Sequence, residues 1–211
     1  MPEQLKTEAA KPLRSLSHPL YNLPNQLTAA RLVLGVALFV LIAVEQWMWC
    51  ILVFALAAVT DYLDGYFARK QGIASSLGRV FDPLVDKVLI CGAYIFVLGQ
   101  PFVRTGLAAW MVTIVVAREL IINGLRSFFE SRGVSFGADW LGKIKMALQC
   151  AALFGVFSVL QCEKTGQSDG VVATLAFLRN WLIYLMLLAT ALSGLQYLWR
   201  AALIFQRETE D

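Results

Sequence analysis

The chain has 211 residues, of which 58% are hydrophobic, and its formal charge at neutral pH is only +3. Soluble domains are usually about 45–50% apolar, so this composition favours a membrane protein. The weak charge and the lack of a dense basic face with interleaved aromatic residues argue against a nucleic-acid partner. The four cysteines form no Cys-x-x-Cys pair and the single histidine, His18, lies near the N-terminus, so metal–thiol and histidine acid–base chemistry are not indicated.

Three segments are expected along the chain. Residues 1–20 are a polar tail without the features of a secretory signal peptide, and residues 15–23 either hold a short interfacial helix or lack regular structure. Residues 21–203 form the membrane domain, and residues 204–211 form a second tail. Apolar runs within the domain predict six transmembrane helices, at about 27–44, 47–66, 81–98 and 106–129, a fifth ending near 160, and a sixth at 172–198. The predicted fold is therefore an all-α integral membrane protein.

Two details of these runs carry further expectations. Breakers from Arg69 to Arg79 predict a loop, and Pro83 suits the first turn of the third helix. Arg179 and Asn180 interrupt the last apolar run, so that helix could begin only at Trp181.

Basic residues predict the orientation of the helices. If the N-terminus is cytoplasmic, only Arg104, Lys164 and Arg179 of the 18 Lys and Arg residues fall on the outer side. The positive-inside rule then places both termini in the cytoplasm.

Four carboxylates flank the loop between the second and third helices. Asp61 and Asp64 are three residues apart, and Asp82 and Asp86 are four apart, so each pair shares one helix face. If the two helices form an antiparallel hairpin, the four side chains converge, and their repulsion in a low dielectric favours one or two divalent cations. Oxygen ligands suit Mg²⁺ or Mn²⁺. The sequence therefore predicts a metal site that opens to the cytoplasm.

The residues between the two pairs indicate a phosphate-containing ligand. Gly65 and Ala68 leave room near the backbone, Arg69 can hold a phosphate, and Gly78 ends the loop. With the four carboxylates they complete the pattern D-x2-D-G-x2-A-R-x8-G-x3-D-x3-D, by which the chain resembles the CDP-alcohol phosphatidyltransferase family. A hairpin whose acids merely cap helices or form salt bridges would not require eight fixed positions.

The resemblance implies a donor, a metal centre and a reaction. Two divalent ions, Mg²⁺ or Mn²⁺, would be ligated by Asp61, Asp64 and Asp82, with Asp86 acting as a ligand, as the general base, or as both. The donor would be CDP-diacylglycerol. The residues implied for its site are Gly65, Ala68, Arg69 and Gly78 and, as a weaker inference, Asn25, Thr28 and Arg31. From its spacing alone, Arg31 is interpreted slightly better as a side chain that snorkels to the interface.

Further motifs resemble the branch of the family that makes phosphatidylglycerophosphate. They are N-Q-L-T-A-A-R at 25–31, A-R-E-L at 117–120, G-L-R at 124–126 and W-L-G-K-I-K at 140–145. The acceptor of this branch, glycerol 3-phosphate, is a dianion and needs cations. The candidates are Arg118, Arg126, Lys143 and Lys145.

Structural roles for these cations remain open. Arg118 is as readily explained by a salt bridge with Glu119, and Arg126 by a basic flank of its helix. Lys143 and Lys145 are two positions apart and lie on different helix faces, so one could bind the acceptor and the other lipid headgroups. Lys87 receives no role.

The expected function is transfer of a phosphatidyl group from CDP-diacylglycerol to glycerol 3-phosphate, giving phosphatidylglycerophosphate and CMP. The expected setting is a bacterial inner membrane, with the active site facing the cytoplasm, lipids around the helices and a homodimeric assembly. One alternative is the same chemistry with inositol phosphate, serine or phosphatidylglycerol as acceptor. A distant alternative is a divalent-cation transporter, which would need acids near the midplane on several helices.

Overall fold

The computed structural model describes residues 23–71, 76–132 and 140–210. Within its helices, the side chains of residues 23–28, 61–71, 76–83, 86, 205 and 207–210 lie outside the described set. The described residues form helices and no strand, which confirms the all-helical prediction. The helices are α1 (Leu23–Ala43), α2 (Trp47–Gln71), α3 (Ser76–Val97), α4 (Phe102–Thr105), α5 (Ala109–Ser131), α6 (Trp140–Lys164) and α7 (Asp169–Glu210).

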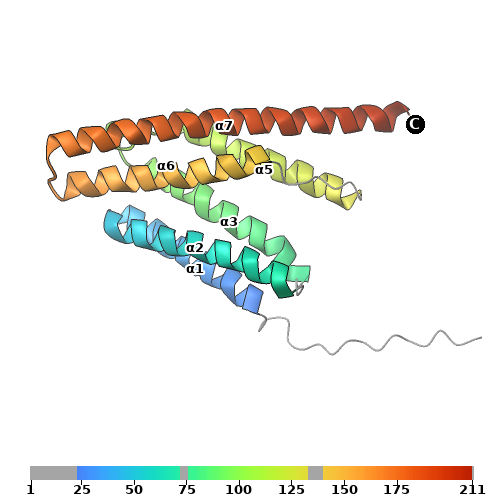
Figure 1. Ribbon diagram of the computed structural model, residues 1–211, viewed down its shortest axis with the longest axis horizontal. Helices are drawn as coiled ribbons and strands as arrows, with labels where there is room; N and C mark the ends of the chain where they lie inside the picture. The colour runs from blue at the N-terminus through green and yellow to red at the C-terminus, as the bar shows by residue number, and fades with distance from the viewer. Residues whose placement is uncertain (1–22, 72–75, 133–139, 211) are drawn as a thin grey trace, which may run out of the picture.

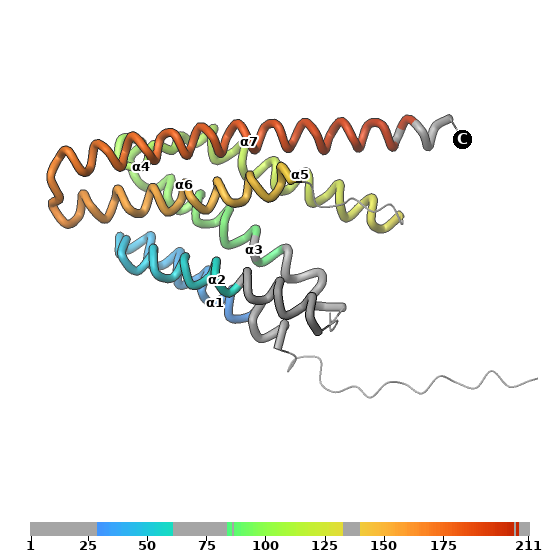
Figure 2. The backbone as a smooth tube through the Cα atoms, in the orientation of Figure 1, coloured from blue at the N-terminus to red at the C-terminus, as the bar shows by residue number. Residues whose placement is uncertain are grey.

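The long helices lie side by side in an elongated bundle (Figure 1). Helix α7 runs along its full length, with α6 beside it. Helix α1 packs on both α2 and α3, α2 packs on α6, and α5 packs on α7 and α3. The backbone trace shows the same order, with α3 crossing between the α1–α2 pair and the α6–α7 pair (Figure 2). Helix α3 therefore contacts elements from both halves of the bundle.

Buried aromatic residues join α2 to α6. Trp47 is fully buried and stacks on Phe157 with ring centroids 6.4 Å apart. Phe54, two turns further along α2, contacts Phe154 at 4.9 Å and Phe157 at 6.1 Å between centroids. Burying such large rings removes much apolar surface from water or lipid and fixes the two helices in one register.

A close approach joins α1 to α3. A Cβ added at Gly92 would lie 2.2 Å from Cζ of Phe39, so only a glycine accommodates this ring. The same ring stacks on Phe96 with centroids 4.9 Å apart and planes 7° from parallel.

Polar contacts close the end of the bundle where α6 turns into α7. Nε of Arg104 donates to Glu163 at 2.9 Å, and Nζ of Lys164 donates to the backbone oxygen of Glu45 at 2.7 Å. Arg179 is buried and donates to the backbone oxygen of Arg104. The three basic residues predicted for the outer side thus lie at one end of the bundle.

Several helix boundaries differ from the sequence predictions. Helix α2 continues to Gln71 and α3 begins at Ser76, so the predicted loop is shorter and Pro83 lies inside α3 rather than in its first turn. The residues Ala, Arg, Lys and Gln at 68–71, which follow the first carboxylate pair, favour helix, which explains the extension of α2. Helix α4, one turn long, ends at Gly106, whose φ of 69° is left-handed, and α5 therefore begins at Ala109.

Arg179 and Asn180 do not interrupt α7, which is continuous from Asp169 and passes through most of the predicted tail to Glu210. The side chain of Arg179 is buried and is satisfied there: it donates to Asn180 Oδ1 at 3.0 Å and to the backbone of Arg104. A break in the helix is unnecessary because these groups bond to one another and to α4.

Two helices are long and apolar enough to cross a membrane, at Trp140–Lys164 and Asp169–Ile204. Shorter apolar stretches of the described residues lie at Ala29–Ala43, Trp47–Thr60 and Lys87–Val97. Large apolar side chains are exposed on many helices, and α7 alone exposes a long row of them. Its members include Phe177, Trp181, Leu185, Leu188, Leu192, Leu195 and Trp199.

Candidate active site

The two carboxylate pairs occupy consecutive helices. Asp61 and Asp64 lie in the second half of α2, and Asp82 and Asp86 lie in the first half of α3. Only residues 72–75 connect these helices, and α1 packs against both. The four side chains lie outside the described residues, so their role as metal ligands stays a prediction.

The same holds for most of the predicted donor site. The side chains of Asn25, Thr28, Ala68 and Arg69 lie outside the described set, as do the surroundings of Gly65 and Gly78. The backbone at all six positions is helical, in α1, α2 or α3.

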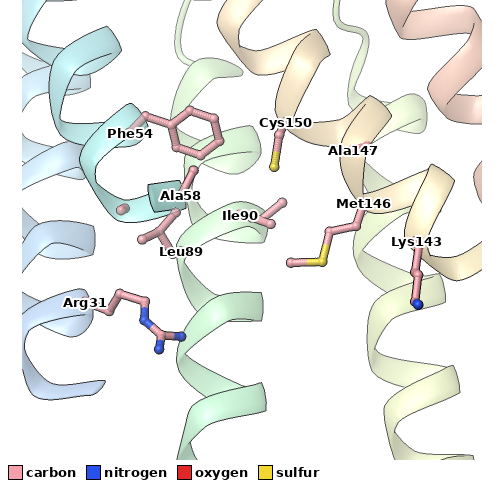
Figure 3. Close-up of a pocket in the computed structure, with 10 residues that line it drawn as sticks. Arg31, Phe54, Ala58, Leu89, Ile90, Lys143, Met146, Ala147 and Cys150 are labelled. Carbon is pink, nitrogen blue, oxygen red and sulfur yellow. The ribbon is translucent and has the colours of Figure 1, made fainter. Parts of the chain in front are cut away.

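Arg31 is the member of the predicted donor site that the structure describes. Its side chain is only 3% exposed, so the interpretation that it snorkels to the interface is wrong. It faces a cavity of about 510 Å³ between α1, α2, α3 and α6 (Figure 3). The other walls are mainly apolar, and the exposed Lys143 is a second cation in the lining. The remaining lining residues are Phe54, Ala57, Ala58, Leu89, Ile90, Met146, Ala147 and Cys150.

A second cavity, of about 230 Å³, lies between α3, α5, α6 and α7. All four cations predicted for the acceptor line it, together with a fifth, Lys87. The lining residues are Lys87, Arg118, Glu119, Ile122, Asn123, Arg126, Gly142, Lys143, Lys145, Met146 and Tyr197. Five cations and one carboxylate leave this cavity, as far as its described lining goes, with a surplus of four formal positive charges. We refer to it as the cationic cavity.

Glu119 neutralises part of this charge from inside the cavity. Its Oε1 accepts a hydrogen bond from Nζ of Lys145 and lies 3.4 Å from Nη1 of Arg118. Arg118 also donates to Ser193 at 2.9 Å, and its guanidinium lies 5.6 Å from the ring centroid of Tyr197. The salt bridge that was the alternative explanation of Arg118 is therefore present, and it lies within the cationic cavity.

Arg126 and Lys87 are held by uncharged partners. Nη2 of Arg126 donates to the hydroxyl of Tyr197 at 3.2 Å, and Nζ of Lys87 donates to Oδ1 of Asn123. The hydroxyl of Tyr197 positions Arg126 without cancelling its charge. Sequence reasoning missed Lys87, although its place one turn before the buried Ile90 indicates a side chain directed at the bundle rather than at lipid.

Lys143 and Lys145 line the same cavity despite their spacing. Lys145 is 4% exposed and reaches Glu119, whereas Lys143 is exposed and reaches the cavity from its rim. The prediction that they serve separate surfaces overlooked the length of a lysine side chain, which spans neighbouring faces of a helix. Lys143 and Met146 also line the larger cavity, so the two cavities share a wall.

A helical bundle that places five cations around one cavity, beside a helix bearing two carboxylates, is typical of an enzyme that handles phosphate esters. The family model for CDP-alcohol phosphatidyltransferases matches residues 21–193 of the chain. The chain belongs to the CDP-alcohol phosphatidyltransferase family, as its sequence pattern predicted.

Curated relatives are consistent with this family. The chain is 34% identical over 151 residues to a protein of Bacillus subtilis, covering 64% of the chain and 75% of the relative. It is 31% identical over 188 residues to a protein of Pectobacterium atrosepticum, covering 84% and 93% respectively. A protein of Rickettsia felis is 37% identical over 136 residues, covering 63% and 72%. Each relative is named CDP-diacylglycerol–glycerol-3-phosphate 3-phosphatidyltransferase.

Proposed function

We propose that the chain transfers the phosphatidyl group of CDP-diacylglycerol to glycerol 3-phosphate, giving phosphatidylglycerophosphate and CMP. The observation that carries this proposal is the cationic cavity, which gathers Arg118, Arg126, Lys143 and Lys145 beside the carboxylate-bearing α3. The names of the relatives from three bacteria agree with it.

The charge of the cationic cavity favours a dianionic acceptor. A surplus of four positive charges within a bundle is costly unless an anion balances part of it. Glycerol 3-phosphate brings two negative charges, whereas serine is zwitterionic and free inositol is neutral. Guanidinium groups such as those of Arg118 and Arg126 also match the geometry of a phosphate.

The larger cavity suits the donor. Arg31 is buried at its wall, and the small side chains of Ala57 and Ala58 leave space beside α2. Its mainly apolar lining is compatible with the glycerol backbone and the first methylene groups of a lipid. Gly65, Ala68, Arg69 and Gly78 belong to the proposed donor site, with Asn25, Thr28 and Arg31 contributed by α1.

The carboxylates fit a hard divalent cation. Asp61, Asp64, Asp82 and Asp86 supply only oxygen atoms, the donor type that Mg²⁺ and Mn²⁺ prefer. Two ions held by these residues would neutralise the diphosphate of the donor and the charge that develops on departing CMP.

The proposed reaction exchanges one phosphorus–oxygen bond for another. The primary hydroxyl oxygen of glycerol 3-phosphate bonds to the phosphorus that carries diacylglycerol, and the bond from that phosphorus to the bridging oxygen breaks. CMP leaves with the electron pair, and the hydroxyl proton passes to the carboxylate of Asp86. This assignment follows from sequence position, because Asp86 directly precedes Lys87 of the cationic cavity and is the carboxylate nearest to it along α3.

The chain is proposed to act as a six-span protein of a bacterial inner membrane, with the active site and both termini facing the cytoplasm. The exposed apolar side chains of α7 and the two helices of membrane-spanning length support an apolar surrounding. A homodimer is proposed from the family resemblance.

An acceptor comparison tests the function. Detergent-purified protein with CDP-diacylglycerol and Mg²⁺ or Mn²⁺ is offered glycerol 3-phosphate, inositol phosphate, inositol or serine, while CMP release is measured. We expect release with glycerol 3-phosphate alone. Asp86→Asn should reduce it to background, whereas Asp169→Asn, the same change at the far end of α7, should leave it unchanged. Preference for another acceptor, or full activity of Asp86→Asn, contradicts the proposal.

A further inference from the structure

The cationic cavity continues into a smaller chamber deeper in the bundle. This inner chamber has a volume of about 160 Å³ and shares Lys87, Glu119, Arg126, Lys145 and Met146 with the cationic cavity. Its further lining residues are Ile90, Cys91 and Gln149. The three residues that line the inner chamber but not the cationic cavity therefore carry no charge.

Gln149 is the polar residue that the inner chamber adds. Its residue surface is 1% exposed, and its Nε2 has no hydrogen-bond partner among the described residues. The helix around it is firmly placed, because its backbone oxygen accepts a hydrogen bond from the hydroxyl of buried Tyr94 at 2.9 Å. A buried amide donor without a partner is costly to a fold, so its presence beside a cavity indicates a ligand that accepts a hydrogen bond from it.

The position of Gln149 indicates which part of a ligand it meets. It follows Lys145 by one turn of α6, and Cys91 follows Lys87 by one turn of α3, so the chamber extends away from Asp86 along both helices. A group that reaches Gln149 is therefore not the hydroxyl that reacts. It is also not the phosphate, because Arg118 and Lys143 line the cationic cavity but not the inner chamber, so the cations are most numerous in the cationic cavity.

We infer that Gln149 is a specificity-determining residue that donates a hydrogen bond to the central, non-reacting hydroxyl of the acceptor. This inference rests on the proposed function, since it assumes a small polyol phosphate in the cationic cavity. Gln149 then selects an acceptor with a hydroxyl beside the reacting carbon, whereas the cations select for phosphate. A site that hydrogen-bonds one hydroxyl discriminates against the analogue that lacks it, since the buried donor is otherwise left unpaired.

The test pairs two acceptors with two proteins. Glycerol 3-phosphate is compared with 3-hydroxypropyl phosphate, which has the phosphate and the primary hydroxyl but lacks the central hydroxyl. Wild-type protein should show a kcat/KM about tenfold higher for glycerol 3-phosphate. Gln149→Leu should lower kcat/KM for glycerol 3-phosphate by about tenfold and leave that for 3-hydroxypropyl phosphate nearly unchanged, so that the preference disappears.

A matched control and a second variant separate this role from a structural one. Gln161→Leu makes the same change three turns further along α6, outside the lining of either chamber, and should retain the wild-type preference. Gln149→Met keeps the length of the side chain without a donor and should behave as Gln149→Leu does, which covers the case in which the leucine variant fails to fold.

Each remaining outcome overturns the inference. An equal fall for both acceptors would assign Gln149 to the fold or to the phosphate, and an unchanged ratio would show that it does not contact the hydroxyl. Wild-type protein that uses both acceptors equally well would also refute the inference while leaving the proposed function intact. If wild-type protein released no CMP with glycerol 3-phosphate, the proposed function itself would fail.

Discussion

Glu119 is the residue whose replacement tests the electrostatics of the cationic cavity most directly. Its side chain is buried, accepts a hydrogen bond from Lys145 and pairs with Arg118 at 3.4 Å. Glu119→Gln preserves the shape of the side chain and removes its charge. Both cations then remain within the bundle without their counter-charge, and the surplus of positive charge in the cavity increases by one.

The cost follows from the geometry of the pair. Two unit charges 3.4 Å apart attract by about 5 kcal/mol at an effective dielectric constant of about 20. Part of this attraction is offset because a buried carboxylate loses hydration, and the glutamine oxygen still accepts a hydrogen bond. We expect Glu119→Gln to lower the free energy of unfolding by about 3 kcal/mol, near the lower end for breaking a buried ion pair.

Inorganic phosphate provides the diagnostic measurement. In the wild-type protein, phosphate and Glu119 compete for the same cations, whereas in Glu119→Gln phosphate replaces the missing charge. Phosphate should therefore raise the melting temperature of Glu119→Gln by more than that of the wild type, when detergent-purified proteins are heated with increasing phosphate. Glu130→Gln makes the same change at an exposed site of α5, and its melting temperature should equal that of the wild type with and without phosphate.

Two results would refute the reasoning. If Glu119→Gln and Glu130→Gln have the same melting temperature in the absence of phosphate, the ion pair does not stabilise the fold. If phosphate stabilises both variants equally, the cations that surround Glu119 are not the ones that bind phosphate, and the acceptor site lies elsewhere.

Three further predictions concern the helix contacts and the metal. Gly92→Val should lower the free energy of unfolding by about 2 kcal/mol in a melting experiment, because a Cβ at this position would lie 2.2 Å from the ring of Phe39. Gly124→Ala is the control, since a Cβ there meets nothing within 4 Å, and it should change the free energy of unfolding little. Equal losses of stability in the two variants would contradict this packing. Arg179→Met removes the buried hydrogen bond to the backbone of Arg104 and should lower the free energy of unfolding by about 2 kcal/mol in the same experiment. The KM for the acceptor should stay constant. A raised KM would instead link that end of the bundle to the acceptor site. Chelation with EDTA should reduce CMP release to background, and added Mg²⁺ or Mn²⁺ should restore it; activity that survives chelation would refute the metal proposal.

The helices could be predicted from apolar periodicity and length, but not all of their boundaries. Long apolar runs define α1, α5 and α6 within a few residues of the observed bounds. The prediction was wrong at Arg179 and Asn180, because polar residues within an apolar run break a helix only when no partner satisfies them. In the bundle, Arg179 donates to the adjacent Asn180 and to the backbone of Arg104 in α4. The second contact joins segments that are far apart in sequence.

The site was predictable to different depths. Motifs that resemble one branch of the family predicted that Arg118, Arg126, Lys143 and Lys145 bind an anionic acceptor, although structural roles stayed open for the two arginines. All four line one cavity. Lys87 and Gln149 were not predictable in the same way, because neither belongs to a charged motif that suggests a ligand. Their roles appear only when α3 and α6 pack side by side and direct both residues into the same space.

In the proposed reaction, donor and acceptor meet at the wall between the two cavities. Lys143 and Met146 line both the cavity that contains Arg31 and the cationic cavity. A lysine at this wall can contact a phosphate on either side, and its exposed stem leaves it free to move between them. Met146, unbranched and adaptable, fills the wall without fixing its shape. In the proposed transfer, the acceptor hydroxyl therefore passes these two residues to reach the donor phosphorus.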